Sequence, residues 1–201
     1  MGWNGVFRAS AGGVPGLSPI PIACRWTHVF LMKSRVQVAR HALHPMLVVF
    51  PVGLLATSVV WDVCYLVSGD RSWGMISVAT IVAGVVGALA AAIPGFVDWL
   101  AIPHGTRARR IGAYHMVLNL IVVGLFVVSL VQRLMTPGGY DVAGAGRMAV
   151  GWIGLAIMAV SSWLGGELVE TMGISVSDSA NADAPSSLRQ RRHPSRPQTR
   201  A

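Results

Sequence analysis

The chain has 201 residues, of which 53% are hydrophobic and only 12% are charged, and it carries a formal net charge of +8. Together with a mean hydropathy of +0.58, this composition excludes an ordinary soluble domain and is typical of an integral membrane protein. The basic residues form no patch interleaved with aromatic residues, so we expect no nucleic-acid partner.

The first 40 residues precede the apolar part of the chain and read as a leader. The first 31 of them are rich in Gly, Pro and Ser and have neither a helical period nor an apolar run of signal-peptide length. We expect residues 1–40 to be a disordered cytoplasmic leader. An equally good alternative is that translation starts at Met32, which opens the basic run Met32-Lys33-Ser34-Arg35, and that residues 1–31 are not translated.

Four apolar segments follow, and each is long enough to cross a hydrocarbon core as a helix. We predict helices over about residues 44–67, 75–102, 111–134 and 148–166. The connections are short and contain Gly, Pro and Asp, which favours antiparallel neighbours. The sequence therefore predicts an all-α fold, a polytopic four-helix membrane bundle spanning residues 41–176.

The second segment carries small residues at every fourth position. These are Ala79, Ala83, Gly87, Ala91 and Gly95, beside a parallel row of Thr80, Gly84, Ala88 and Ala92. Small side chains allow close approach of helices in lipid. We expect this helix to be central in the bundle, although the same stripe also fits the face of a homodimer.

The last segment, residues 177–201, is a polar tail with a basic run. It contains few large apolar residues and cannot bury enough surface to offset the entropy of ordering. We expect it to be a disordered, basic cytoplasmic tail.

The positive charges lie mainly on one side of the predicted bundle. Treating every Lys and Arg as outside the four segments assigns thirteen of the sixteen to the leader, the second loop and the tail. Only Arg71, Arg133 and Arg147 fall on the other side. The positive-inside rule then places both termini and the second loop in the cytoplasm.

Polar side chains at membrane depth are the candidate functional residues. With this topology, His44, Asp98, His115, Asn119 and Glu167 all reach one layer near the cytoplasmic face. By contrast, Asp62 is expected to stand alone near the outer end of the first helix.

Each candidate also has a purely structural interpretation. His44 precedes Pro45 and fits an interfacial helix cap. Asp98 could reach water or pair with Arg107, and Glu167 could be solvated at the boundary. His115 is the hardest to explain in this way, because its neighbours are apolar.

Several short motifs occur along the chain in a specific order. They are the run from His44-Pro45 to Gly53 with Asp62, Gly95-Phe96-Val97-Asp98, His115 with Asn119, Gly165-Gly166-Glu167-Leu168-Val169 and Gly173-Ile174-Ser175-Val176. In this order and spacing they resemble the bacterial DUF2231 family of four-helix membrane proteins. The resemblance covers about residues 41–176 and implies the fold and a location in the bacterial cytoplasmic (inner) membrane. Some relatives are joined to Rieske-type iron–sulfur domains, which suggests an association with redox proteins. In this chain, Cys24 and Cys64 cannot supply cluster ligands.

Our first hypothesis is that His44 and His115 are axial ligands of a b-type haem on the cytoplasmic side. Asp98 or Asn119 would then hold the second ring nitrogen of a ligand histidine. The protein would be a small electron-transfer or redox-sensing subunit with a redox partner protein.

Two further hypotheses stay open. One makes His44, Asp98, His115 and Glu167 a divalent-metal or proton site. The other is an accessory structural membrane protein without a cofactor, whose polar side chains only stabilise helix packing. No nucleophile with a base and no phosphate loop is evident, which argues against an enzyme, and no inverted repeat is evident, which argues against a transporter.

Overall fold

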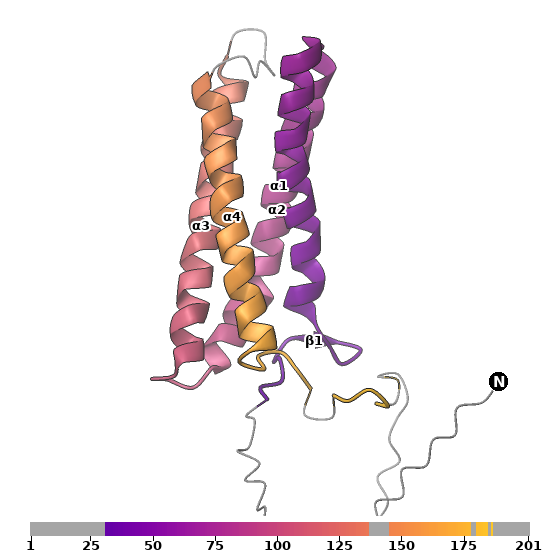
Figure 1. The fold of residues 1–201 in the computed structure, drawn as a ribbon, viewed down its shortest axis with the longest axis vertical. Coiled ribbons are helices and arrows are strands. Elements are labelled where there is room, and N and C mark those ends of the chain that lie inside the picture. Colours follow the sequence, from indigo (N-terminus) through magenta and orange to yellow (C-terminus); the bar gives the residue numbers. More distant parts are fainter. Residues whose placement is uncertain (1–30, 137–144, 178–179, 185, 187–201) are drawn as a thin grey trace, which may run out of the picture.

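The computed structural model describes residues 31–136, 145–177, 180–184 and 186, and Figure 1 shows how its long helices are arranged. They are α1 (Leu43–Ser68), α2 (Arg71–Ala101), α3 (Arg107–Leu134) and α4 (Ala145–Glu170). Two short strands, β1 (Gln37–Val38) and β2 (His41–Ala42), pair antiparallel before α1. All four helices contain a segment long and apolar enough to cross a membrane. The predicted all-α membrane bundle is confirmed.

Local chemistry explains where the helices begin and end. At the first turn, Gly69 adopts a left-handed conformation with φ 69° and closes α1. The Asp70 side chain then accepts a hydrogen bond from the Ser72 backbone and begins α2. At the second turn, the Thr106 hydroxyl accepts a bond from the Arg109 backbone and begins α3. The first turn makes the antiparallel α1–α2 hairpin, and the second connects this hairpin to α3.

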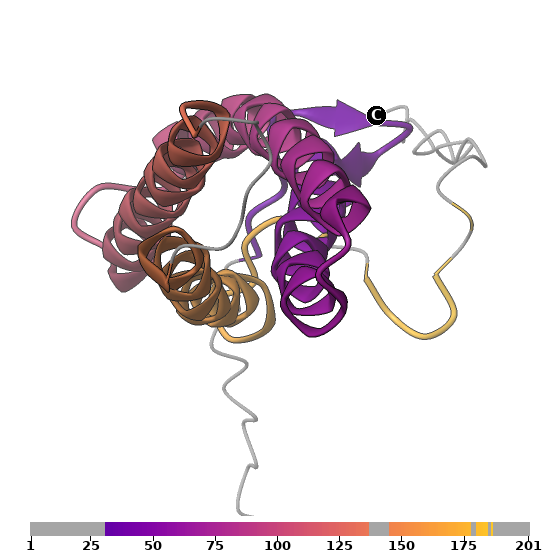
Figure 2. The same cartoon turned by 90° about the horizontal axis from the view of Figure 1, so that it is seen from above.

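The α1–α2 hairpin and the α3–α4 hairpin pack against each other as a four-helix bundle. Helix α1 packs mainly along α2, and α3 mainly along α4. Seen from above in Figure 2, α1 lies diagonally opposite α3, with α2 and α4 between them. The core cluster comes from all four helices, and its buried members are Leu55, Val59, Ile81, Val85, Val122, Phe126 and Met158.

The small residues of α2 receive side chains of α1. A Cβ built on Gly84 would lie 2.7 Å from Leu55 Cδ2, and one built on Gly87 would lie 2.8 Å from a ring carbon of Phe50. Close approach in the stripe is therefore used inside the chain. This packing gives no support to the homodimer face.

The segment before α1 belongs to the folded domain. The Met32 backbone N–H donates to the Gly173 carbonyl at 3.0 Å, and the Ser175 N–H donates to the Met32 carbonyl at 2.7 Å. The chain before α1 is thus hydrogen-bonded at Met32 to the residues that follow α4. The predictions for residues 1–30 and most of those for the tail fall outside the described residues.

Candidate functional site: a histidine pair between two helical hairpins

The two histidines of α1 and α3 meet between the hairpins. The ring centroids of His44 and His115 lie 6.3 Å apart, with the rings nearly perpendicular at 86°. Both rings are partly buried. The predicted pairing of these two side chains is therefore present in the fold, and it joins the two diagonally opposite helices.

Each ring is held by its hairpin partner in the same way. The Nδ1 atom of His44 lies 2.8 Å from the Ala91 carbonyl of α2, and that of His115 lies 2.8 Å from the Ser161 carbonyl of α4. A carbonyl oxygen only accepts, so these contacts place the ring proton on Nδ1 and the lone pair on Nε2. His44 is thus fixed by α2 and is not an interfacial cap.

A glycine provides room for each ring. A Cβ built on Gly95 would lie 2.7 Å from two atoms of the His44 ring, and one built on Gly165 would lie 3.0 Å from His115 Cε1. In each hairpin the glycine lies about one helical turn after the residue whose carbonyl accepts from the histidine, at 91 and 95 and at 161 and 165. These two glycines belong to the short motifs of the sequence, and their role is to seat the histidines.

Asn119 lies beside the pair, but it contacts Nε2 of His115, whereas the haem hypothesis expects it at the other ring nitrogen. Its side-chain amide nitrogen is 3.1 Å from Nε2 of His115 and donates to the His115 carbonyl at 2.9 Å. The Ser161 hydroxyl also approaches Nδ1 of His115 at 3.2 Å. Both ring nitrogens of His115 therefore have partners within the protein.

Asp98 has a different role from the one expected. Its carboxylate accepts hydrogen bonds from the Ser34 hydroxyl at 2.7 Å and from the backbone N–H groups of Arg35 and Val36 at 2.7 and 3.3 Å. The side chain is buried, with 5% of the residue exposed. It fastens the segment before α1 to the end of α2, and it pairs neither with a histidine nor with Arg107.

Glu167 is also engaged elsewhere. It forms an ion pair of 3.1 Å with Arg107, which joins the start of α3 to the end of α4. Among the described residues, no three His, Cys, Asp or Glu side chains come together in a group that could hold a metal ion. The four-residue metal site is therefore not assembled in this part of the chain.

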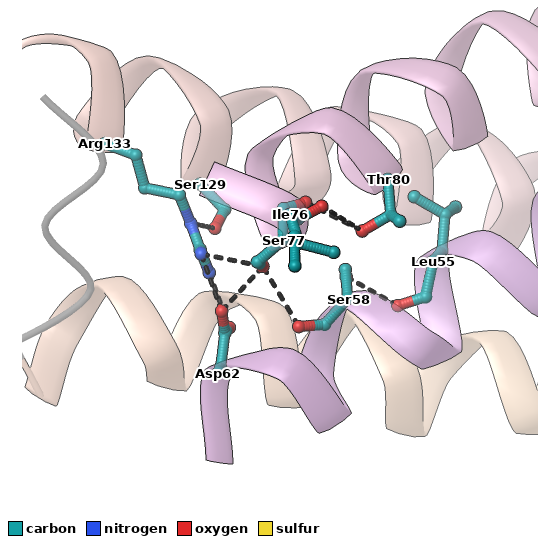
Figure 3. A network of polar contacts seen from close by, with 8 residues as sticks. All are labelled: Leu55, Ser58, Asp62, Ile76, Ser77, Thr80, Ser129 and Arg133. Atoms are coloured by element: carbon teal, nitrogen blue, oxygen red, sulfur yellow. Dashed lines mark hydrogen bonds and ion pairs between the residues drawn. The ribbon is translucent and has the colours of Figure 1, made fainter. Parts of the chain in front are cut away.

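The expectation that Asp62 stands alone is wrong. Arg133 donates to both carboxylate oxygens of Asp62, from Nη1 at 2.7 Å and from Nη2 at 2.6 Å, as Figure 3 shows. Arg133 is 0% and Asp62 is 1% exposed. The basic side chain that had been assigned to a loop lies inside α3 and crosses the bundle.

Three serines complete this buried network. The Ser77 hydroxyl donates to Asp62 at 2.7 Å and receives a bond from Arg133 at 3.0 Å, while Arg133 Nε donates to Ser129 at 3.1 Å. The Ser77 hydroxyl also contacts the Ser58 carbonyl. Every charged atom of the pair is thus hydrogen-bonded, which is what a buried ion pair requires. An acid and a base at matching depth on different helices were the signal in the sequence.

Comparison with known proteins gives one result. Residues 40–178 match the family described as a predicted membrane protein (DUF2231). No curated protein and no solved structure matches the chain. The matched range contains all four helices, both histidines and their glycines.

Proposed function

The chain belongs to the DUF2231 family of predicted membrane proteins, and from its own side chains we propose that it is a small redox subunit that binds one b-type haem between His44 and His115. The observation that carries the proposal is the meeting of these two imidazoles from opposite hairpins. In the proposed topology the haem lies toward the cytoplasmic face of a bacterial inner membrane, and electrons pass to a redox partner protein.

The separation of the two rings suits ligation of one iron. An iron–nitrogen bond of about 2 Å, by analogy with other metal–imidazole bonds, and about 1.1 Å from nitrogen to ring centre place two ligand imidazoles roughly 6 Å apart. The observed centroid separation is 6.3 Å. Bound haem would supply a one-electron redox couple, and the two histidines would hold it.

The hydrogen bonds of Nδ1 also suit ligand histidines. Such histidines usually donate their second ring N–H to a carboxylate or a backbone carbonyl, which fixes the ring and its tautomer. Here Ala91 and Ser161 supply the carbonyls. Backbone carbonyls of α2 and α4 have this role instead of Asp98, which accepts hydrogen bonds from the segment before α1.

Asn119 must give up one contact if Nε2 of His115 is to bind iron. Its amide nitrogen contacts both that Nε2 and the His115 carbonyl. The carbonyl contact can remain when Nε2 is taken, so the amide group keeps a partner. Asn119 would then position the helix beside the site without being a ligand.

The same contacts support a second candidate, an accessory bundle without a cofactor. Both ring nitrogens of His115 have partners within the protein, so its burial needs no ligand. In that case the histidines only fasten helices, with an average contribution of about 0.6 kcal/mol for each hydrogen bond in a membrane.

An absorption spectrum separates the two candidates. The protein is purified in detergent from cells supplied with haem precursor and is measured oxidised and then reduced with dithionite. We expect a sharp α band after reduction, and about one haem per chain, because one pair of histidines would hold one haem. His44→Ala and His115→Ala should each lose the band.

The matched control is His104→Ala, which changes an exposed histidine in the turn between α2 and α3 and should keep the band. Each variant is first shown to be monodisperse by size-exclusion chromatography. A featureless spectrum from folded wild-type protein, also after addition of haemin, would reject the haem and leave the accessory bundle.

A further inference from the structure

The two hairpins repeat each other along the sequence. When His44 is aligned with His115, α1 and α3 run in register at a separation of 71 residues, the separation of Asp62 and Arg133. Identical residues then coincide at 44 and 115, 47 and 118, 52 and 123, 53 and 124, 54 and 125, 58 and 129, and 60 and 131. The halves lack an inverted repeat, but they carry this parallel one.

The buried positions repeat as well. In α1 and α3 the matched buried pairs are Pro51 and Val122, Leu55 and Phe126, Ser58 and Ser129, and Asp62 and Arg133. In α2 and α4, at a separation shorter by one residue, they are Val78 and Met148, Ile81 and Gly151, Gly84 and Gly154, and Ala91 and Ser161. The hairpins therefore present equivalent faces to the centre of the bundle.

Equivalent residues also make equivalent contacts. Leu55 of the first hairpin packs on Gly84, and Phe126 of the second packs on Gly154. The two histidines are seated on Gly95 and Gly165 in the same way. This correspondence indicates an approximate twofold relation about the long axis of the bundle.

One equivalent pair differs in the sign of its charge. Asp62 and Arg133 meet across the centre and are almost completely buried. If the first hairpin packed against a second copy of itself, two carboxylates would face each other there, and two copies of the second hairpin would bring two guanidinium groups together. Like charges buried at this distance repel strongly.

We infer that the chain is a covalent pair of repeated hairpins, and that the Asp62–Arg133 contact makes the central face of each hairpin specific for the other hairpin rather than for its own copy. The contact is a recognition element between the hairpins, comparable to a charge pair that sets partner choice between similar helices. It is independent of any ligand at the histidines.

Because the hairpins repeat, α1 also carries a serine that could accept a hydrogen bond from an arginine at position 62. Arg133 Nε donates to Ser129, four residues earlier on α3. Ser58 stands four residues before position 62 on α1, and within the described part of the chain its hydroxyl donates only to the carbonyl of Leu55. An arginine at 62 would therefore find in Ser58 the partner that Arg133 finds in Ser129.

Charge reversal of the full chain tests the inference. Asp62→Arg puts two guanidinium groups at the centre, and Arg133→Asp puts two carboxylates there. We expect each single reversal to lower the thermal midpoint in detergent by about 10 °C or more, or to abolish the monodisperse peak. The reciprocal variant Asp62→Arg/Arg133→Asp should recover at least half of that loss. Recovery should be incomplete because Ser77 donates to a carboxylate at position 62, and the reciprocal variant moves this carboxylate to position 133.

The serine that accepts a hydrogen bond from the buried arginine should differ between the wild type and the reciprocal variant. In the wild type, Ser129→Ala should lower the midpoint more than Ser58→Ala does. In the reciprocal variant the order should reverse, because Ser58 then receives the bond. The inference is overturned if the reciprocal variant is no more stable than the single reversals, or if the order of the two serines stays the same.

Discussion

Gly95 of α2 lies so close to His44 of α1 that a Cβ at the glycine would come within 2.7 Å of two ring atoms. The His44 ring occupies the space in which any residue other than glycine at position 95 would place its Cβ. The other hairpin repeats the arrangement with Gly165 and His115 at 3.0 Å. Each histidine position is thus determined by a glycine as well as by a hydrogen bond.

Substitution of these glycines should displace the rings. We expect Gly95→Ala to destabilise the protein by about 1–3 kcal/mol, the usual cost of overpacking, with a smaller cost for Gly165→Ala. For a chain of this length, that corresponds to a fall in the thermal midpoint of roughly 2–4 °C per kcal/mol. Thermal unfolding in detergent, followed by circular dichroism, measures it.

Matched controls lie on the neighbouring helices. Gly53 and Gly124 have open space where a Cβ would go. Gly53→Ala and Gly124→Ala should leave the midpoint unchanged or raise it slightly, because alanine favours a helix interior by about 0.5–1 kcal/mol. Equal losses at Gly95 and Gly53 would contradict the seating of His44.

Asp98 should control how firmly the segment before α1 is attached. Asp98→Asn leaves one acceptor oxygen for three donors, those of Ser34, Arg35 and Val36. We expect trypsin cleavage after Lys33 and Arg35 to become several-fold faster, because local opening limits cleavage there. Mass spectrometry of the fragments over time gives the rates at these two bonds.

Glu167→Gln is the control for Asp98→Asn, because it removes an ion pair at the same end of the bundle. That pair is partly solvated, with the Arg107 side chain 64% exposed, so its loss should cost no more than about 1 kcal/mol. Cleavage after Lys33 and Arg35 should stay at the wild-type rate. Equal acceleration in both variants would show that Asp98 has no special role.

Ser77 should be the most sensitive serine of α2. Its hydroxyl accepts from Arg133 and lies within hydrogen-bond distance of two acceptors for its one proton, the Asp62 carboxylate and the Ser58 carbonyl. Ser77→Ala leaves buried groups short of a partner, and we expect a loss of about 1–3 kcal/mol in the free energy of unfolding. The shift of the thermal midpoint in detergent reports it.

Thr57→Ala provides the comparison for Ser77→Ala. The Thr57 hydroxyl bonds to the Gly53 carbonyl within α1 and is exposed. Its loss should change the stability by no more than about 0.5 kcal/mol. If the two variants shift the midpoint equally, the network around Ser77 does not stabilise the bundle.

Asp70 should contribute a pH-dependent cap to α2. Hydrogen bonds from the side chain and then the backbone of Ser72 lower the pKa of Asp70 below its ordinary value of 3.8. The folded state therefore binds the proton more weakly than the unfolded state does. The stabilising contribution is complete above the unfolded pKa and is lost as the pH falls through the lower folded value.

The midpoints of wild type and Asp70→Ala should thus differ at pH 7 and converge as the pH falls below 3.8. Asp70→Asn retains a good cap without a titrating group. Its midpoint relative to Asp70→Ala should not change over this range. A wild-type advantage that persists at the lowest pH would refute the assignment.

The sequence alone determined the four helices and their approximate ends. Apolar runs of membrane length can satisfy their backbone groups only within the segment, so hydropathy and turn residues suffice. It also predicted His44 and His115 as candidate functional residues, because ionisable side chains are rare in apolar membrane segments. These properties are local, because they depend on the residues of each segment and not on how the segments pack together.

Only the tertiary structure decided which polar groups meet. It placed Arg133 opposite Asp62, gave Asp98 to the segment before α1 and seated each histidine on a glycine of the next helix. The sequence shows the depth of a side chain but not the direction in which it points around its helix. That direction is fixed when the helices pack, and it determines whether a buried charge finds its partner.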